Sequence, residues 1–103
     1  MSGWIENDES TIPLNIAFDV DGTLIHQVGE AEDTPRYDVI AIFHFYKNLG
    51  YNMFIWSGGG VSYAQRWSQK LGLKAKIIEK GSFQPDLVFD DMNVNLGIVN
   101  IRV

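Results

Sequence analysis

The chain has 103 residues, a net charge of −5 and a hydrophobic fraction of 46%, which is typical of one ordinary globular domain. It contains no cysteine, so disulfides, thiolate zinc sites and cysteine nucleophiles are excluded. The basic residues are mostly scattered, which argues against nonspecific nucleic-acid binding. No apolar run approaches the roughly 18 residues of a membrane span, and no signal peptide is visible, so we expect a cytoplasmic protein without membrane contact.

The order of the predicted elements defines one domain after a short polar start. Residues 1–13 are polar and acidic and are expected to form a flexible lead-in, and residues 14–103 form the domain. Residues 23–34 are polar and predict a loop or a small hairpin. Apolar runs predict strands at residues 14–20, 51–56, 75–79, 86–89 and 97–103. Apolar spacings of three or four and closing glycines predict helices at residues 37–49 and 61–71.

Strands that alternate with helices predict the fold class. Such an order favours right-handed crossovers between parallel strands. We therefore expect an α/β domain with a five-stranded, mainly parallel sheet and helices on both faces, which is a three-layer α/β/α, Rossmann-like architecture. The strand at residues 97–103 is expected at an edge of this sheet.

Two acidic clusters follow predicted strands. Asp19 and Asp21 come at the end of the first strand, and Asp90 and Asp91 at the end of the fourth. Open α/β sheets bind ligands at the carboxyl ends of their strands, so we expect these carboxylates in one cleft. Crowded carboxylates raise each other's pKa unless a cation intervenes. Mg2+ is the favoured ion, because a few carboxylates with phosphate and water oxygens suffice to hold it.

The residue types at these positions suit phosphoryl transfer. Asp19 would attack phosphorus and form an acyl phosphate, while Asp21 would handle the proton of the leaving group. Ser57 and Gly58 begin a glycine-rich segment before a predicted helix, where a hydroxyl and backbone N–H groups can bind phosphoryl oxygens. This segment matches neither a P-loop nor a dinucleotide-binding fingerprint.

A fixed cation is the remaining requirement, because it would neutralise charge that develops on the transferred group. Lys80 precedes Asp90 by ten residues and Lys76 precedes it by fourteen. Either lysine could take this role.

The motifs together resemble those of the haloacid dehalogenase-like superfamily of phosphohydrolases. The resemblance rests on residues 19–23 (DVDGT), on Ser57 after a hydrophobic strand, on a lysine, and on the pair Asp90 and Asp91. It covers about residues 14–91. The combination of DxDGT with a late pair of aspartates after strands is fairly specific.

The resemblance implies a role for each residue. Asp19 would be the nucleophile and Asp21 the general acid and base. Mg2+ would be held by the side chain of Asp19, the backbone carbonyl of Asp21 and the side chain of Asp90, with Asp91 orienting the metal shell. Lys80 is favoured over Lys76, because residues 80–86 look like the short connection from lysine to strand in small members of the family.

The chain looks like a minimal member without a cap domain. About 36 residues separate the first motif from Ser57 and about 32 lie between Ser57 and Asp90, too few for a cap. Relatives of this kind act on bulky phosphorylated substrates or use a neighbouring subunit of a homo-oligomer as a lid. The expected function is Mg2+-dependent hydrolysis of a phosphomonoester through an aspartyl-phosphate. A noncatalytic metal-binding or protein-interaction module and a phosphotransferase to an acceptor other than water remain as alternatives.

Overall fold

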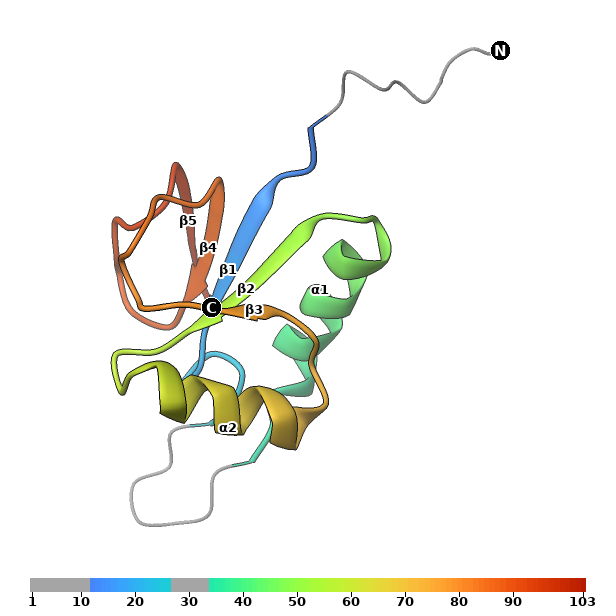
Figure 1. The fold of residues 1–103 in the computed structure, drawn as a ribbon, viewed down its shortest axis with the longest axis vertical. Coiled ribbons are helices and arrows are strands. Elements are labelled where there is room, and N and C mark those ends of the chain that lie inside the picture. The colour runs from blue at the N-terminus through green and yellow to red at the C-terminus, as the bar shows by residue number, and fades with distance from the viewer. Residues whose placement is uncertain (1–11, 27–33) are drawn as a thin grey trace.

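The computed structural model describes residues 12–26 and 34–103. Most of the predicted lead-in at residues 1–13 and most of the predicted segment at residues 23–34 therefore lie outside the described residues. The elements, in chain order, are β1 (Asn15–Asp19), α1 (Tyr37–Asn48), β2 (Asn52–Trp56), α2 (Val61–Leu71), β3 (Lys76–Ile77), β4 (Leu87–Asp90) and β5 (Val99–Arg102) (Figure 1). Every predicted helix and strand is present, with ends that differ by at most two residues.

The five strands form one sheet in the order β3-β2-β1-β4-β5, and every neighbouring pair is parallel. The prediction of a five-stranded, parallel α/β sheet is confirmed, and so is the edge position of β5. The chain adds β2 and β3 on one side of β1 and then β4 and β5 on the other. The direction of winding thus reverses at β1, and the carboxyl ends of β1 and β4 lie side by side. Open α/β sheets bind their ligands at such a reversal.

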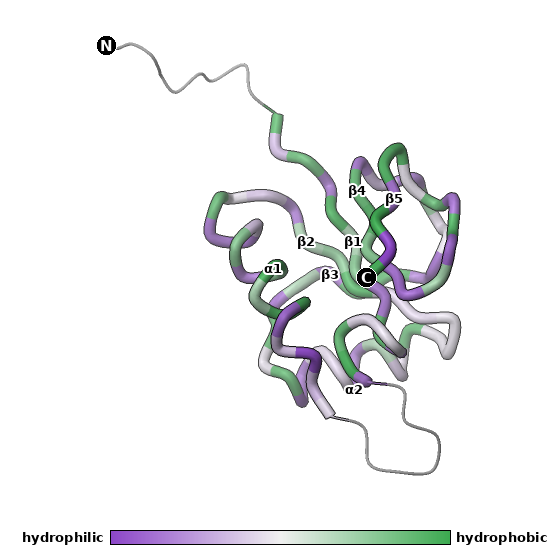
Figure 2. Tube along the Cα trace, turned by 180° about the vertical axis from the view of Figure 1, so that it is seen from behind, coloured by the Kyte–Doolittle hydropathy of each residue, from purple (hydrophilic) through white to green (hydrophobic). Residues whose placement is uncertain are grey.

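Both helices pack against the same face of the sheet. One buried cluster joins Phe43 of α1 and Ala64 of α2 to Ile16 and Phe18 of β1. On this face the ring of Phe18 stacks on Phe89 of β4 at 4.6 Å between centroids. Side chains of alternate strand residues point to opposite faces, so Ala17 belongs to the other face. Figure 2 shows hydrophobic residues along the central strands and a mixture of polar and hydrophobic residues along the helices.

The opposite face is covered by irregular segments, so the predicted helical layer on that face is not confirmed within the described residues. A second cluster there contains Ala17, Trp56 and Val88, and the side chains that pack on it include Phe83 and Leu96 from the connections around β4. The cause is topological. Right-handed crossovers that extend a sheet in one direction share a face, and those that extend it in the other direction cross the second face. The two connections on the second face are too short and too rich in turns to form a helix.

Among the residues that the structure describes, no helix is long and apolar enough to cross a membrane.

Candidate functional site

A tight turn follows β1 and brings the first motif over the carboxyl edge of the sheet. The backbone carbonyl of Val20 accepts three hydrogen bonds at 3.0–3.2 Å, from the N–H groups of Thr23, Leu24 and Ile25. These three residues and Val20 are fully buried. The turn therefore has a fixed conformation, and it places Asp21 beyond the end of the strand that carries Asp19.

Gly22 is required at the centre of this turn for two reasons. Its φ of 77° lies in the left-handed region, which residues with a Cβ rarely adopt. A Cβ at this position would also overlap the carboxylate of Asp91. The guanidinium of Arg36 donates a hydrogen bond of 3.0 Å to the carbonyl of Gly22. The glycine thus allows the two acidic motifs to approach each other, and Arg36 fixes the turn from outside.

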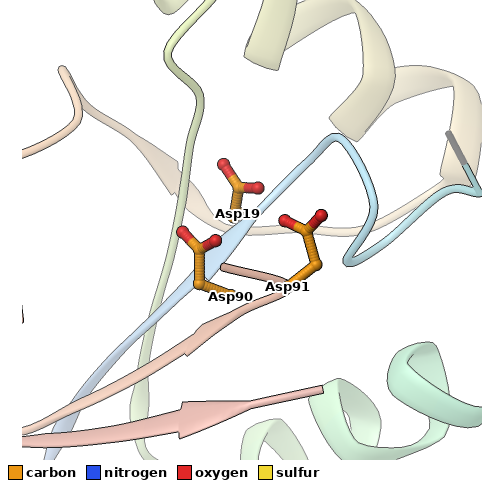
Figure 3. A group of neighbouring side chains, drawn as sticks. All are labelled: Asp19, Asp90 and Asp91. Atoms are coloured by element: carbon orange, nitrogen blue, oxygen red, sulfur yellow. The ribbon is translucent and has the colours of Figure 1, made fainter. Parts of the chain in front are cut away.

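Three carboxylates meet at the winding reversal. Oxygens of Asp19, Asp90 and Asp91 all lie within 4.8 Å of one another, and their side chains converge in Figure 3. Asp19 and Asp90 are almost fully buried, with 4% and 1% of their surfaces exposed. The sequence prediction that the two acidic clusters share one site is in agreement with this geometry. Asp21 stands apart from the three, although it lines the same depression.

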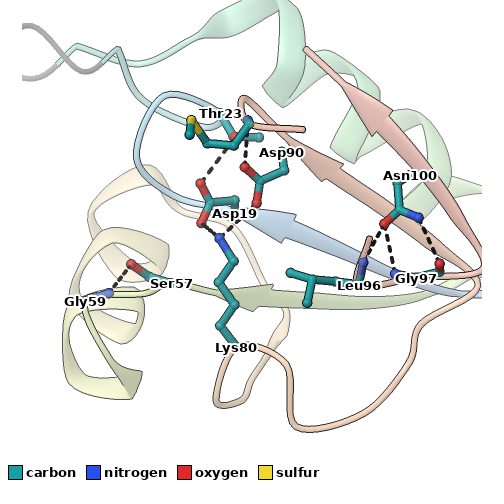
Figure 4. A network of polar contacts seen from close by, with 10 residues as sticks. Asp19, Thr23, Ser57, Gly59, Lys80, Asp90, Leu96, Gly97 and Asn100 are labelled. Atoms are coloured by element: carbon teal, nitrogen blue, oxygen red, sulfur yellow. Dashed lines mark hydrogen bonds and ion pairs between the residues drawn. The ribbon is translucent and has the colours of Figure 1, made fainter. Parts of the chain in front are cut away.

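Lys80 binds this cluster directly. Its Nζ lies 3.0 Å from Oδ1 of Asp19 and 2.8 Å from Oδ2 of Asp90 (Figure 4). The remaining oxygen of Asp90 accepts a hydrogen bond of 2.9 Å from the backbone N–H of Met92. Lys76, the other candidate, is exposed in β3 and does not line the depression. Of these two lysines, Lys80 is therefore the one that contacts the carboxylates.

The charges of the site shift the pKa of its groups. Burial raises the pKa of Asp19 to about 6; the hydrogen bond from Lys80 opposes this shift and the charge of Asp90 adds to it. Burial, with the neighbouring carboxyl group of Asp90, also raises the pKa of Asp91. Burial disfavours the charged form of Lys80, but its hydrogen bonds with Asp90 and Asp19 outweigh this effect, and its pKa lies above the usual range.

The donor set fits a hard divalent cation. Four carboxylates and a single ammonium line the depression, with no other charged side chain of the described residues on its wall. Carboxylate oxygens are preferred ligands of Mg2+. Among the described residues, the wall carries no histidine or cysteine, and Met92 is its one residue with a soft sulfur atom. Asp19, Asp90 and Asp91 could each supply an oxygen, which for Asp91 goes beyond the orienting role expected from the sequence. Asp21 would have to contribute through its backbone, as expected.

The glycine-rich turn forms the facing wall of a depression of about 230 Å3. Ser57, which follows β2 directly, and Gly58 both line it, as the sequence analysis predicts for a phosphate-binding segment. The hydroxyl oxygen of Ser57 accepts a hydrogen bond of 3.0 Å from the N–H of Gly59. Because that oxygen acts as the acceptor, the hydroxyl proton can be donated into the depression.

Two residues of the site were not anticipated. Tyr63, in the first turn of α2, donates a hydrogen bond to Oδ1 of Asp21. Arg36, just before α1, holds the turn as described above. Of these two residues, only Tyr63 had a sequence signal for its place near the site. A helix that begins after the Ser57 turn starts at the carboxyl edge of the sheet, so its first turn lies beside the site.

Comparisons with protein-family models, with curated proteins and with solved structures find no significant match.

Proposed function

We propose that the protein is a Mg2+-dependent phosphomonoesterase that acts through an aspartyl-phosphate, as its resemblance to the haloacid dehalogenase-like superfamily implies. The observation that carries this proposal is the position of Asp19. This carboxylate lies at the winding reversal, in contact with Lys80 and beside two further carboxylates, and it faces a small polar depression. A carboxylate held in this way beside a cation and an anion-binding turn suits nucleophilic attack on phosphorus.

In the first half of the proposed reaction, an oxygen of Asp19 forms a bond to phosphorus while the bond from phosphorus to the ester oxygen breaks. The carboxyl group of Asp21 gives its proton to the departing oxygen, so an alcohol leaves. In the second half, Asp21 takes a proton from water as the water oxygen attacks phosphorus. The bond from Asp19 to phosphorus then breaks, and inorganic phosphate is released.

The walls of the depression would bind the phosphoryl group during both steps. Ser57 donates its hydroxyl proton and Gly58 presents unobstructed backbone, so both can contact phosphoryl oxygens. The ammonium of Lys80 neutralises negative charge beside Asp19. The side chains of Asp19 and Asp90, with the carbonyl of Asp21 and with Asp91 as support, would hold Mg2+, which would supply Lewis-acid neutralisation of the phosphoryl oxygens.

The substrate we propose is a phosphomonoester that supplies much of its own enclosure. The depression of about 230 Å3 has room for a phosphoryl group and little more. A bulky phosphorylated substrate, or a second copy of the chain, would then exclude water from the reacting atoms.

The test compares hydrolysis of an aryl phosphate by the wild type, Asp19→Asn and Asp86→Asn, each with Mg2+ and with excess chelator. Asp86 provides the matched control, because it lies at the other end of the sheet and accepts a hydrogen bond from the N–H of Asn15. We expect turnover only with Mg2+, loss of turnover in Asp19→Asn, and wild-type turnover in Asp86→Asn. Full activity of folded Asp19→Asn would refute the mechanism.

A further inference from the structure

Tyr63 is placed by contacts that fix both its ring and its hydroxyl group. It is half-buried in the first turn of α2. Its ring lies against Gly59, where an added Cβ would come within 3.1 Å of a ring carbon. The guanidinium of Arg66 lies 5.9 Å from the ring centroid. The hydroxyl group donates a hydrogen bond to Oδ1 of Asp21. The side chain therefore reaches from the phosphate-binding turn to the turn after β1.

The orientation of Asp21 depends on this hydrogen bond more than the orientations of the other carboxylates depend on any single contact. Asp19 and Asp90 are buried and share the ammonium of Lys80, and Asp91 packs against Gly22. Asp21 is only half-buried and lies outside both the strand and the cluster of three carboxylates. Its hydrogen bond comes from α2, which is 42 residues further along the chain.

We propose that Tyr63 is the positioning residue of the general acid and base. Its hydroxyl group holds Oδ1 of Asp21, so that Oδ2 is the oxygen that exchanges a proton with the ester oxygen and then with water. This inference rests on the proposed phosphatase function and adds a residue to it. Tyr63 does not touch the reacting atoms, and its effect passes through the orientation of Asp21. A hydroxyl donor suits this task, since it binds one carboxylate oxygen and leaves the other for substrate.

The position of Tyr63 predicts which substrates its loss would affect. An aryl phosphate releases a stable phenolate and needs little help from an acid. An alkyl phosphate releases an alkoxide, which must be protonated as the bond to phosphorus breaks. Correct placement of a general acid contributes roughly 100-fold to 10,000-fold to the rate of such a step. Tyr63→Phe keeps the ring and removes only the hydroxyl group, so it should slow alkyl esters selectively.

The experiment measures kcat/KM for 4-nitrophenyl phosphate and for ethyl phosphate at saturating Mg2+. This parameter reports the steps up to formation of the aspartyl-phosphate, in which Asp21 donates its proton. We expect Tyr63→Phe to raise the ratio of aryl to alkyl activity at least about tenfold, as a partial loss of acid catalysis. Tyr46→Phe, a half-buried tyrosine of α1 outside the site, should keep the wild-type ratio.

Mg2+ titration calorimetry on Tyr63→Phe provides the structural control, because a positioned Asp21 and an intact metal cluster are separate properties. We expect wild-type Mg2+ affinity. Equal losses on both esters, or no loss, would overturn the role of Tyr63 while leaving the phosphatase mechanism intact. A wild type that turns over neither ester, nor a bulky phosphomonoester such as a phosphopeptide, in an Asp19-dependent way would refute the proposed function itself, and the role of Tyr63 with it.

Discussion

The buried carboxyl group of Asp19 should make the stability of the protein depend on pH in an unusual direction. Most native carboxylates are stabilised by their partners, so proteins lose stability as the pH falls. Asp19 behaves in the opposite way, because burial raises its pKa from the ordinary value of 3.8 to about 6. Between these two values the folded protein binds a proton at Asp19 that the unfolded chain has released.

The sign and the size of the effect follow from this difference. Stability falls with rising pH wherever the folded state binds more protons than the unfolded state. The contribution of Asp19 is thus most favourable below its unfolded pKa and is lost as the pH rises through about 6. At about 1.4 kcal/mol for each unit of pKa, the change from 3.8 to about 6 corresponds to about 3 kcal/mol. Typical domains have a stability of roughly 5–15 kcal/mol, so this change is large enough to measure.

The assay is urea unfolding from pH 4 to pH 7 in the presence of chelator. Asp19→Asn keeps the shape of the side chain and can still accept a hydrogen bond from Lys80, but it cannot titrate. We expect the free energy of unfolding of Asp19→Asn, relative to the wild type, to rise by about 2.4 kcal/mol from pH 4 to pH 7, slightly less than the full value because pH 4 lies just above the unfolded pKa of 3.8. Asp86→Asn, with its half-buried position at the other end of the sheet, should follow the wild type.

Saturating Mg2+ should offset the loss of wild-type stability above pH 6, because the ion binds the ionised carboxylate of Asp19 and stabilises the folded state by mass action. At a hundredfold excess over the dissociation constant, the gain is about 2.7 kcal/mol. The gain should fade toward pH 4, where protons compete with the metal. Parallel stability curves for the wild type and Asp19→Asn in chelator would refute the argument, because the titration of Asp19 would then contribute nothing.

Two further substitutions test the turn and the lysine. Gly22→Ala should destabilise the fold by at least about 1–2 kcal/mol, the cost of the left-handed conformation, and should also weaken Mg2+ binding by displacing Asp91. Gly50→Ala is the control, because Gly50 also has a left-handed backbone but an added Cβ there would meet nothing. Gly50→Ala should therefore lower the free energy of unfolding without changing the Mg2+ affinity measured by calorimetry. Equal Mg2+ affinity in the two variants would contradict the predicted clash between residue 22 and Asp91. Lys80→Met should lower kcat/KM on an aryl phosphate by about 100-fold or more, as for loss of an electrostatic donor. Lys76→Met should leave kcat/KM unchanged. A loss of kcat/KM in Lys76→Met but not in Lys80→Met would assign the charge-neutralising role to Lys76.

Much of the fold was predictable because its signals are local. A strand buried on both faces contains a short apolar run, and residues 16–18 form such a run within β1. The end of α2 was equally clear, since Gly72 adopts the left-handed conformation at its C-cap with a φ of 69°. The layer on the second face was not predictable in this way. A strand that is apolar on both faces does not indicate whether a helix or an irregular segment covers each face.

The candidate site likewise contains features that local sequence signals predict and features that they do not. The four carboxylates were predictable, because each acidic motif follows its strand directly and parallel strands end at one edge of the sheet. Tyr63 was not predictable as a partner of Asp21, since that contact depends on how α2 crosses the turn after β1. The resemblance favoured Lys80 over Lys76, but the position of each lysine relative to the carboxylates could be seen only in the structure. That position depends on where β3 ends, and the strand is only two residues long.

The position of Lys80 follows from the path of the chain after β3. This strand ends at the carboxyl edge of the sheet, and Lys80 comes three residues later, in a turn closed by a hydrogen bond of 3.0 Å from the N–H of Ser82 to the carbonyl of Glu79. The chain then crosses the second face, where the ring of Phe83 lies 4.9 Å from that of Phe54 and 6.3 Å from that of Trp56. Strand pairing before the lysine and aromatic packing after it leave little freedom to the segment between them. Lys80 is therefore held over the reversal between β1 and β4 by the packing of its neighbours, as well as by the two carboxylates that it binds.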